Sequence, residues 1–301
     1  MTGGPVHYEK VAAMFHIESP LNEVDLAKLT FGEKINLAKE LAKNYGLTIF
    51  VAMLTGLIVI GLVSIVMMSF VDFSLLTGSG FNGRLLLRFI PGAAFFMAVI
   101  GFIGLLFAIG INSLILQYID AYEPYSIFSV VMAPWAKLGT TMTPGLLLWV
   151  GAHLICAFMM GLASMIPLFG AVIASLGYMF FLLVACCAGF NFADLVVNRD
   201  EDLSAWEAVC HPCALVKNNL AIWLSVFAVI VLLSLPADLL LGLGAFMAMG
   251  GRSGFFAICL GLAMIYFLIT SIFMAFFVAL TYRQSRAQSS GVGSNGDRRG
   301  Q

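Results

Sequence analysis

The sequence predicts an all-α polytopic membrane protein with six transmembrane helices, arranged as three tandem repeats of an interfacial amphipathic helix plus a transmembrane hairpin. The first observation is composition: hydrophobic residues make up 61% of the 301 residues, charged residues make up 10%, and the mean hydropathy is +1.01. A water-soluble core cannot hide that much apolar surface. The second is a set of long apolar stretches, and the third is a polar segment that precedes every other stretch.

The apolar stretches predict where the chain crosses the bilayer, since a spanning helix needs about 20 mostly apolar residues. Six stretches qualify: 47–71, 89–118, 145–166, 168–197, 220–243 and 254–281. The third and fourth almost merge, and Pro167 with Gly170 between them predicts a tight hairpin rather than one overlong helix. We expect a cytoplasmic segment over residues 1–28, and a disordered cytoplasmic tail over the Ser-, Gly-, Gln- and Arg-rich residues 284–301.

The polar segments reveal the repeat. Residues 29–44 align without a gap on residues 203–218, and a fainter middle copy begins near Ser126. The membrane domain over 29–283 therefore divides into repeats at approximately 29–120, 126–198 and 203–283.

The first and third copies both begin with a hydroxyl residue three positions before a glutamate, a pattern typical of a capping box at the start of a helix. The predicted pairs are Thr30 with Glu33 and Ser204 with Glu207. The middle copy lacks the glutamate because Ser129 stands in its place.

Helical spacing predicts which face of each polar segment is apolar. In the first copy the apolar face comprises Phe31, Ile35, Ala38, Ala42 and Tyr45, with Lys34 and the other charged residues opposite. In the third copy it comprises Trp206, Val209, Cys210 and Cys213, and Pro212 is expected to kink the helix. We expect these helices to lie in the lipid headgroup region and to anchor the topology.

The basic residues predict the orientation. If the amino terminus is cytoplasmic, twelve of the fifteen Lys and Arg residues lie inside, and only Arg84, Arg88 and Arg252 lie outside. This positive-inside bias places both termini in the cytoplasm. The net charge of −1 gives no support to nucleic acid binding.

A second repeated motif indicates a polar cluster in the helical bundle. Gly110-Ile111-Asn112 ends the second apolar stretch and Gly189-Phe190-Asn191 ends the fourth. An asparagine at membrane depth needs a hydrogen-bond partner. The candidate cluster consists of Asn112, Gln117, His153, Asn191 and Asp194. It serves either as interhelical hydrogen bonding or as a substrate or proton site, and the first reading is favoured because such bonds are common in helical bundles.

Cys210-His211-Pro212-Cys213 resembles a thiol-oxidoreductase signature, but it lies in an interfacial helix instead of following a strand. Cys210, His211 and Cys213 are weak metal candidates, since zinc needs a fourth ligand that only Cys186 or Cys187 offers. We therefore expect no metal and no cofactor. The chain also lacks a serine nucleophile elbow, a zinc-protease motif and a phosphate-binding loop, so no enzymatic activity is expected.

Several short motifs follow one another along the chain: Asp194-Leu195 through Asp200, Leu203 to Ala208, Lys217-Asn218-Asn219, and Leu280 to Arg283 at the end of the last span. In this order they resemble poorly characterised bacterial six-helix inner-membrane proteins related to the membrane domain of glycerophosphodiester phosphodiesterases, and the likeness extends over residues 29–283. Cys210 departs from the pattern, in which a serine is expected. The resemblance implies a bacterial inner-membrane helical bundle, and it implies no phosphodiesterase activity because the catalytic barrel is absent.

These observations favour a non-catalytic scaffold, assembly partner or envelope-homeostasis factor in the bacterial inner membrane. Its expected partners are membrane lipids and other membrane protein subunits. The alternative is a small-solute or lipid transporter that uses the polar cluster. A transporter would give water access to Asn112, His153 and Asn191, whereas a scaffold would keep these groups paired and closed.

Overall fold

The structure is a computed structural model, which describes residues 26–68, 83–120, 126–137, 142–164, 169–197, 204–250 and 253–296. All regular structure in these ranges is helical, as the sequence predicts. A single 3-10 turn, η1 (Leu26–Lys28), comes first. The α-helices are α2 (Phe31–Met68), α4 (Gly83–Ile119), α5 (Ile127–Ala136), α6 (Met142–Ser164), α7 (Phe169–Val197), α8 (Ala205–Asn218), α9 (Leu220–Met249) and α10 (Ser253–Gly296).

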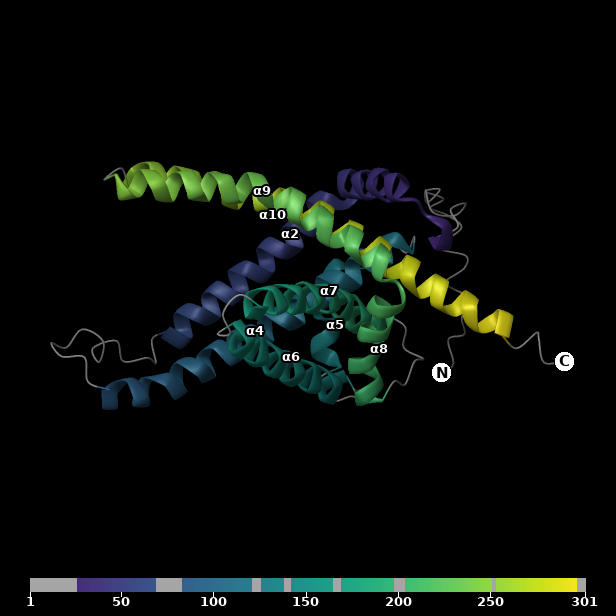
Figure 1. Cartoon of the computed structure of the whole chain (residues 1–301), viewed down its shortest axis with the longest axis horizontal. Helices are drawn as coiled ribbons and strands as arrows, with labels where there is room; N and C mark the ends of the chain where they lie inside the picture. Colours follow the sequence, from purple (N-terminus) through teal and green to yellow (C-terminus); the bar gives the residue numbers. More distant parts are fainter. Residues whose placement is uncertain are drawn as a thin grey trace.

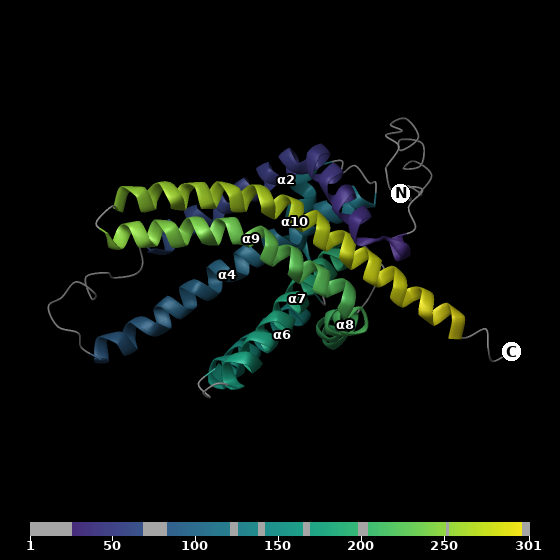
Figure 2. The same ribbon diagram turned by 45° about the horizontal axis from the view of Figure 1, so that its top comes forward.

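Consecutive long helices pack together, α2 with α4, α6 with α7 and α9 with α10, and these pairs are joined by further contacts of α2 with α10 and of α4 with α7. Figures 1 and 2 show that the pairs fan apart toward the left of each view, whereas α8 and the last turns of α10 lie at the opposite end. The short helices α5 and α8 pack there against α4, α6 and α7. The pairs are therefore joined at one common end.

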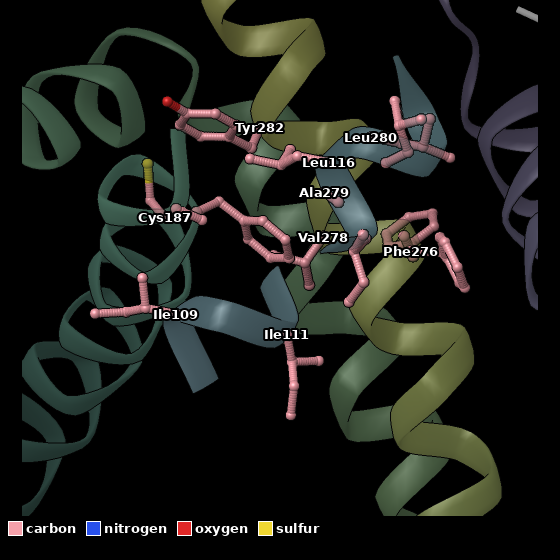
Figure 3. Close-up of a cluster of buried hydrophobic side chains, with 14 of the residues drawn as sticks. Ile109, Ile111, Leu116, Cys187, Phe276, Val278, Ala279, Leu280 and Tyr282 are labelled. Atoms are coloured by element: carbon pink, nitrogen blue, oxygen red, sulfur yellow. The ribbon is translucent and has the colours of Figure 1, made fainter. Parts of the chain in front are cut away.

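The buried core lies at this common end. Its largest fully buried side chains come from the first half of α2, the last turns of α4 and α7, the first turns of α9 and the later part of α10; they include Leu41, Leu116, Phe192, Trp223, Phe276 and Tyr282. Figure 3 shows side chains of α4, α7 and α10 meeting in this cluster. Stacked rings add to the packing, with Tyr45 on Tyr118 at 4.2 Å and Phe190 on Tyr282 at 6.2 Å between ring centroids.

Away from the common end, large apolar side chains are exposed. Four stretches within the described helices are long and apolar enough to cross a membrane: Phe31–Val66, Val99–Ile119, Leu220–Met247 and Gly254–Ser289. Much of the first, third and fourth is not buried by protein, as Leu62, Leu239 and Ile265 illustrate. Apolar surface on this scale is expected of a membrane protein and not of a water-soluble one.

The end of α10 corrects one prediction. The tail was expected to be disordered from residue 284, but α10 continues as a helix to Gly296. Its continuation packs on the first described residues: Gln284 Nε2 donates to Leu29 O, and Gln288 Nε2 donates to Ala27 O, both at 2.8 Å. These contacts offset the poor helix-forming composition of the tail.

Candidate functional site

Both predicted capping boxes are present, and they fix where the helices that frame the common end begin. Thr30 N donates to Glu33 Oε2 at 2.8 Å, and Glu33 N donates to Thr30 Oγ1 at 3.3 Å. Ser204 and Glu207 make the same reciprocal bonds at 2.8 and 3.2 Å. Hydrogen bonds from Ser204 lower the pKa of the Glu207 carboxyl. In the middle copy Ser126 Oγ accepts from Ser129 N at 3.4 Å, without a glutamate.

The packed face of the first polar segment is the predicted apolar face, with two exceptions. Ala38 is buried, and Ile35, Ala42 and Tyr45 are half-buried against the core. Phe31 remains 47% exposed. Lys34, predicted on the polar face, is only 3% exposed, and its Nζ lies 5.5 Å from the centre of the Phe277 ring. The lysine stem covers apolar surface and its charge meets an aromatic face of α10.

The third polar segment, α8, packs on protein with the face opposite its predicted apolar face. Ala208, Pro212, Leu215 and Val216 are buried. Trp206, on the predicted apolar face, is 68% exposed, and Cys210 and Cys213 are exposed as well. The predicted apolar face of α8 is therefore not the face that packs on the rest of the described protein.

The repeated Gly-x-Asn motif marks close helix contacts. A Cβ at Gly110 would clash with the backbone of Val131, so the glycine allows α5 to lie directly on α4. A Cβ at Gly189 would lie 3.0 Å from Nδ2 of Asn112, so this glycine leaves room for the asparagine between α4 and α7. The motif thus serves helix packing in both copies.

Asn191 satisfies a carbonyl that Pro212 leaves without a helical partner. Proline has no N–H, so the carbonyl four residues earlier, that of Ala208, loses its usual donor. Asn191 Nδ2 donates to this oxygen at 3.4 Å, and the asparagine is only 3% exposed. The bond joins α7 to α8 and accounts for a polar group at this depth.

Asp194 is the centre of a buried ionic network between α4, α7 and α10. The carboxylate is 3% exposed and accepts hydrogen bonds from Tyr282 Oη and from Arg283 Nη1, each at 3.0 Å. Arg286 pairs with the same carboxylate through its Nη1. Arg283 also pairs with Asp120, directly after α4, through its Nη2. One guanidinium therefore bridges two helix ends, a geometry that suits arginine better than lysine.

Sequence reasoning found Asp194 but not its partners Tyr282, Arg283 and Arg286, nor Asp120, the second carboxylate of the network. Burial raises the pKa of the Asp120 carboxyl, and the charge of Arg283 opposes that shift. A signal was available, because Asp194 and Leu280 to Arg283 lie at the two ends of the motif set that suggested the family resemblance. The structure brings these ends into contact.

The other predicted cluster members, Asn112, Gln117 and His153, are not among the described contacts of this network. Asn112 packs against Gly189, as noted, and Gln117 has a buried Oε1 that accepts no hydrogen bond from the described residues. His153 lies within α6, but its side chain is outside the described residues. Arg283 Nε and Ser285 Oγ are likewise buried without a partner in the described part of the chain.

The weak metal candidates remain two exposed thiols beside His211. Cys210 and Cys213 lie on the exposed side of α8, Cys187 is buried in α7, and Cys186 beside it is partly buried. Within the described ranges, no three His, Cys, Asp or Glu side chains are grouped so that they could hold a metal ion.

Comparison of the chain with protein families, curated proteins and solved structures finds no match.

Proposed function

We propose that this chain is a bacterial inner-membrane protein that acts as a non-catalytic scaffold, assembly partner or envelope-homeostasis factor. In this proposal it crosses the membrane six times, is built from three tandem repeats, and has both termini in the cytoplasm. Helices α6 and α7, of 23 and 29 residues, support the count of six because 23 residues at 1.5 Å each exceed the roughly 30 Å hydrocarbon core.

One observation carries the choice of a scaffold: the polar side chains that a transport path would use are bonded within the protein. Asp194 accepts bonds from Tyr282 and Arg283, and Asn191 donates to Ala208. Groups paired in this way hold helices together and offer little to a passing solute. The exposed apolar faces of the helix pairs are then the surfaces that meet lipids or other membrane subunits.

The test is native mass spectrometry of the gently solubilised protein, combined with thermal unfolding of Asp194→Asn. The scaffold proposal expects bound lipid or a protein subunit. It also expects Asp194→Asn to lower the melting temperature while that binding is retained, because removing one partner of a buried ion network costs about 3–5 kcal/mol. Asp238→Asn on the exposed side of α9 is the matched control and should change little.

A transporter or lipid-handling protein is the second candidate, and three of the buried side-chain atoms without a hydrogen-bond partner in the described residues favour it. Gln117 Oε1, Arg283 Nε and Ser285 Oγ come from the parts of α4 and α10 that carry the ionic network. Water or a polar solute would satisfy such groups. If Gln117→Leu keeps wild-type melting but loses a solute that the wild-type protein retains, this candidate replaces the scaffold.

A further inference from the structure

Helix α8 presents two thiols on one exposed stripe. Trp206, Cys210, Cys213 and Lys217 recur at helical spacing and are all exposed, opposite the buried Ala208 and Pro212. On a helix, Cβ atoms three residues apart are about 5–6 Å from each other. A disulfide needs about 3.8 Å. A contraction of about 1–2 Å would therefore allow the two sulfurs to bond.

The helix is easiest to distort at this point. Pro212 lies between the two cysteines and has no N–H to donate, so the turn from Ala208 to Pro212 lacks one backbone hydrogen bond. The Ala208 carbonyl is held instead by the side chain of Asn191, at 3.4 Å. A side-chain bond of this length follows a shift of the turn more readily than a helical backbone bond does.

We propose that Cys210 and Cys213 are a modification site, at which exchange with a low-molecular-weight disulfide such as oxidised glutathione forms a reversible intrahelical disulfide. One cysteine thiolate attacks the glutathione disulfide, which forms a mixed disulfide and releases one glutathione. The second thiolate attacks the protein sulfur of that adduct and releases the other glutathione. Two electrons pass to glutathione, and the two protons end on its thiols.

The contraction would reach the neighbouring helices through Ala208. The backbone of α6 passes close to this residue at Gly145, where a Cβ would lie 3.1 Å from the Ala208 Cβ, and Asn191 of α7 donates a hydrogen bond to the Ala208 carbonyl. A shift of this turn therefore alters contacts with both helices of the α6 and α7 pair. On the cytoplasmic side, to which the proposed topology assigns α8, a disulfide of this kind is transient and redox-sensing rather than structural.

The purified full-length protein is incubated with oxidised glutathione, alkylated and analysed by peptide mass spectrometry. The expected result is a loss of two hydrogen atoms confined to the peptide that contains Cys210 and Cys213, reversed by dithiothreitol. Cys210→Ser and Cys213→Ser should each keep a stable glutathione adduct on the remaining thiol, because the resolving step is removed. Cys259→Ser, which changes a buried cysteine on α10, is the matched control and should behave as wild type.

Hydrogen exchange provides the second readout. Oxidation should change exchange in residues 208–216 and around Asn191 in the wild type and not in Cys213→Ser. A persistent glutathione adduct on the wild type, a disulfide between Cys213 and Cys187, or a lack of reaction overturns the proposal. A disulfide that leaves exchange in these segments unchanged overturns the coupling to α7. The assay uses purified protein, so its outcome is separate from the choice between scaffold and transporter.

Discussion

Pro212 explains why an asparagine lies buried on α7. Without the N–H of residue 212, the Ala208 carbonyl would be buried and unbonded, which costs about 1–3 kcal/mol. Asn191 removes this cost and also joins α7 to α8. A proline in one helix therefore gives a physical reason for a polar residue in another.

Asn191→Leu should lower the free energy of unfolding by about 1–3 kcal/mol, because the Ala208 carbonyl loses its donor while the volume of the side chain is nearly kept. The cost should shrink in a Pro212→Ala background, where the backbone N–H of residue 212 is restored. Denaturant unfolding in detergent measures both, as a double-mutant cycle. An equal cost of Asn191→Leu in both backgrounds would show that the asparagine does not serve this carbonyl.

The sequence indicates which polar residues need partners but not which partners they have. Asn191 and Asp194 stand out because polar groups at membrane depth must be bonded. The partners of Asp194 are 88 and 89 residues away along the chain, at Tyr282 and Arg283. Spacing within one helix carries no information about contacts at that separation, so only the arrangement of the helix pairs reveals the network.

At the scale of elements, local signals predict helix starts well. A capping box involves residues three apart, so its bonds form whenever the chain is helical there, and both predicted boxes are present. The face of α8 that packs on protein was not predicted, whereas the apolar face of the first polar segment is largely the packed one. Helix α8 has two largely apolar faces on opposite sides. One carries Trp206, Cys210 and Cys213, and the other carries Ala208, Leu215 and Val216. Hydropathy alone cannot choose between them when both lipid and protein are available.

Ser204→Ala should destabilise α8 by about 1 kcal/mol, the usual cost of losing an N-cap. Thr30→Ala should do the same at the start of α2. Hydrogen exchange measures this as faster exchange confined to residues 205–218 and 31–44. Unchanged exchange in these segments would contradict a stabilising role for the caps.

The Glu207 cap should also depend on pH. Hydrogen bonds from Ser204 lower the pKa of this carboxyl from its ordinary value of 4.5, so its contribution is present above that value and is lost as the pH falls further below it. Protection of α8 should therefore decrease in acid in the wild type, and less so in Glu207→Gln.

At the scale of the whole molecule, the sequence predicts the order of the helices because length and hydropathy decide it. Helices α6 and α7 are separate, as expected, and the predicted turn between them lies outside the described residues. The fan of the helix pairs could not be predicted in the same way, since it depends on core contacts that are concentrated at one end of the described helices. The helical continuation of α10 was missed for a similar reason, because Gln284 and Gln288 are held by carbonyls at the start of the chain.

The arrangement of the pairs also bears on orientation. The starts of α2 and α9 and the ends of α4, α7 and α10 come together with α5 and α8, and this end carries Lys34, Arg283 and Arg286. Arg84, predicted to lie outside, comes in the first turn of α4, at the end of that helix away from this cluster. This separation agrees with the proposed direction of insertion.

Reporter fusions at residues 1 and 301 should both report a cytoplasmic location, because twelve of the fifteen basic residues then lie inside and an even number of spans returns the chain to its starting side. A fusion at residue 251, between α9 and α10, should report the periplasm. Replacing Arg84, Arg88 and Arg252 with Gln should leave the orientation unchanged, since it only strengthens the inside bias. Opposite sides for the two termini would require an odd number of spans, and a periplasmic report from both would reverse the proposed insertion.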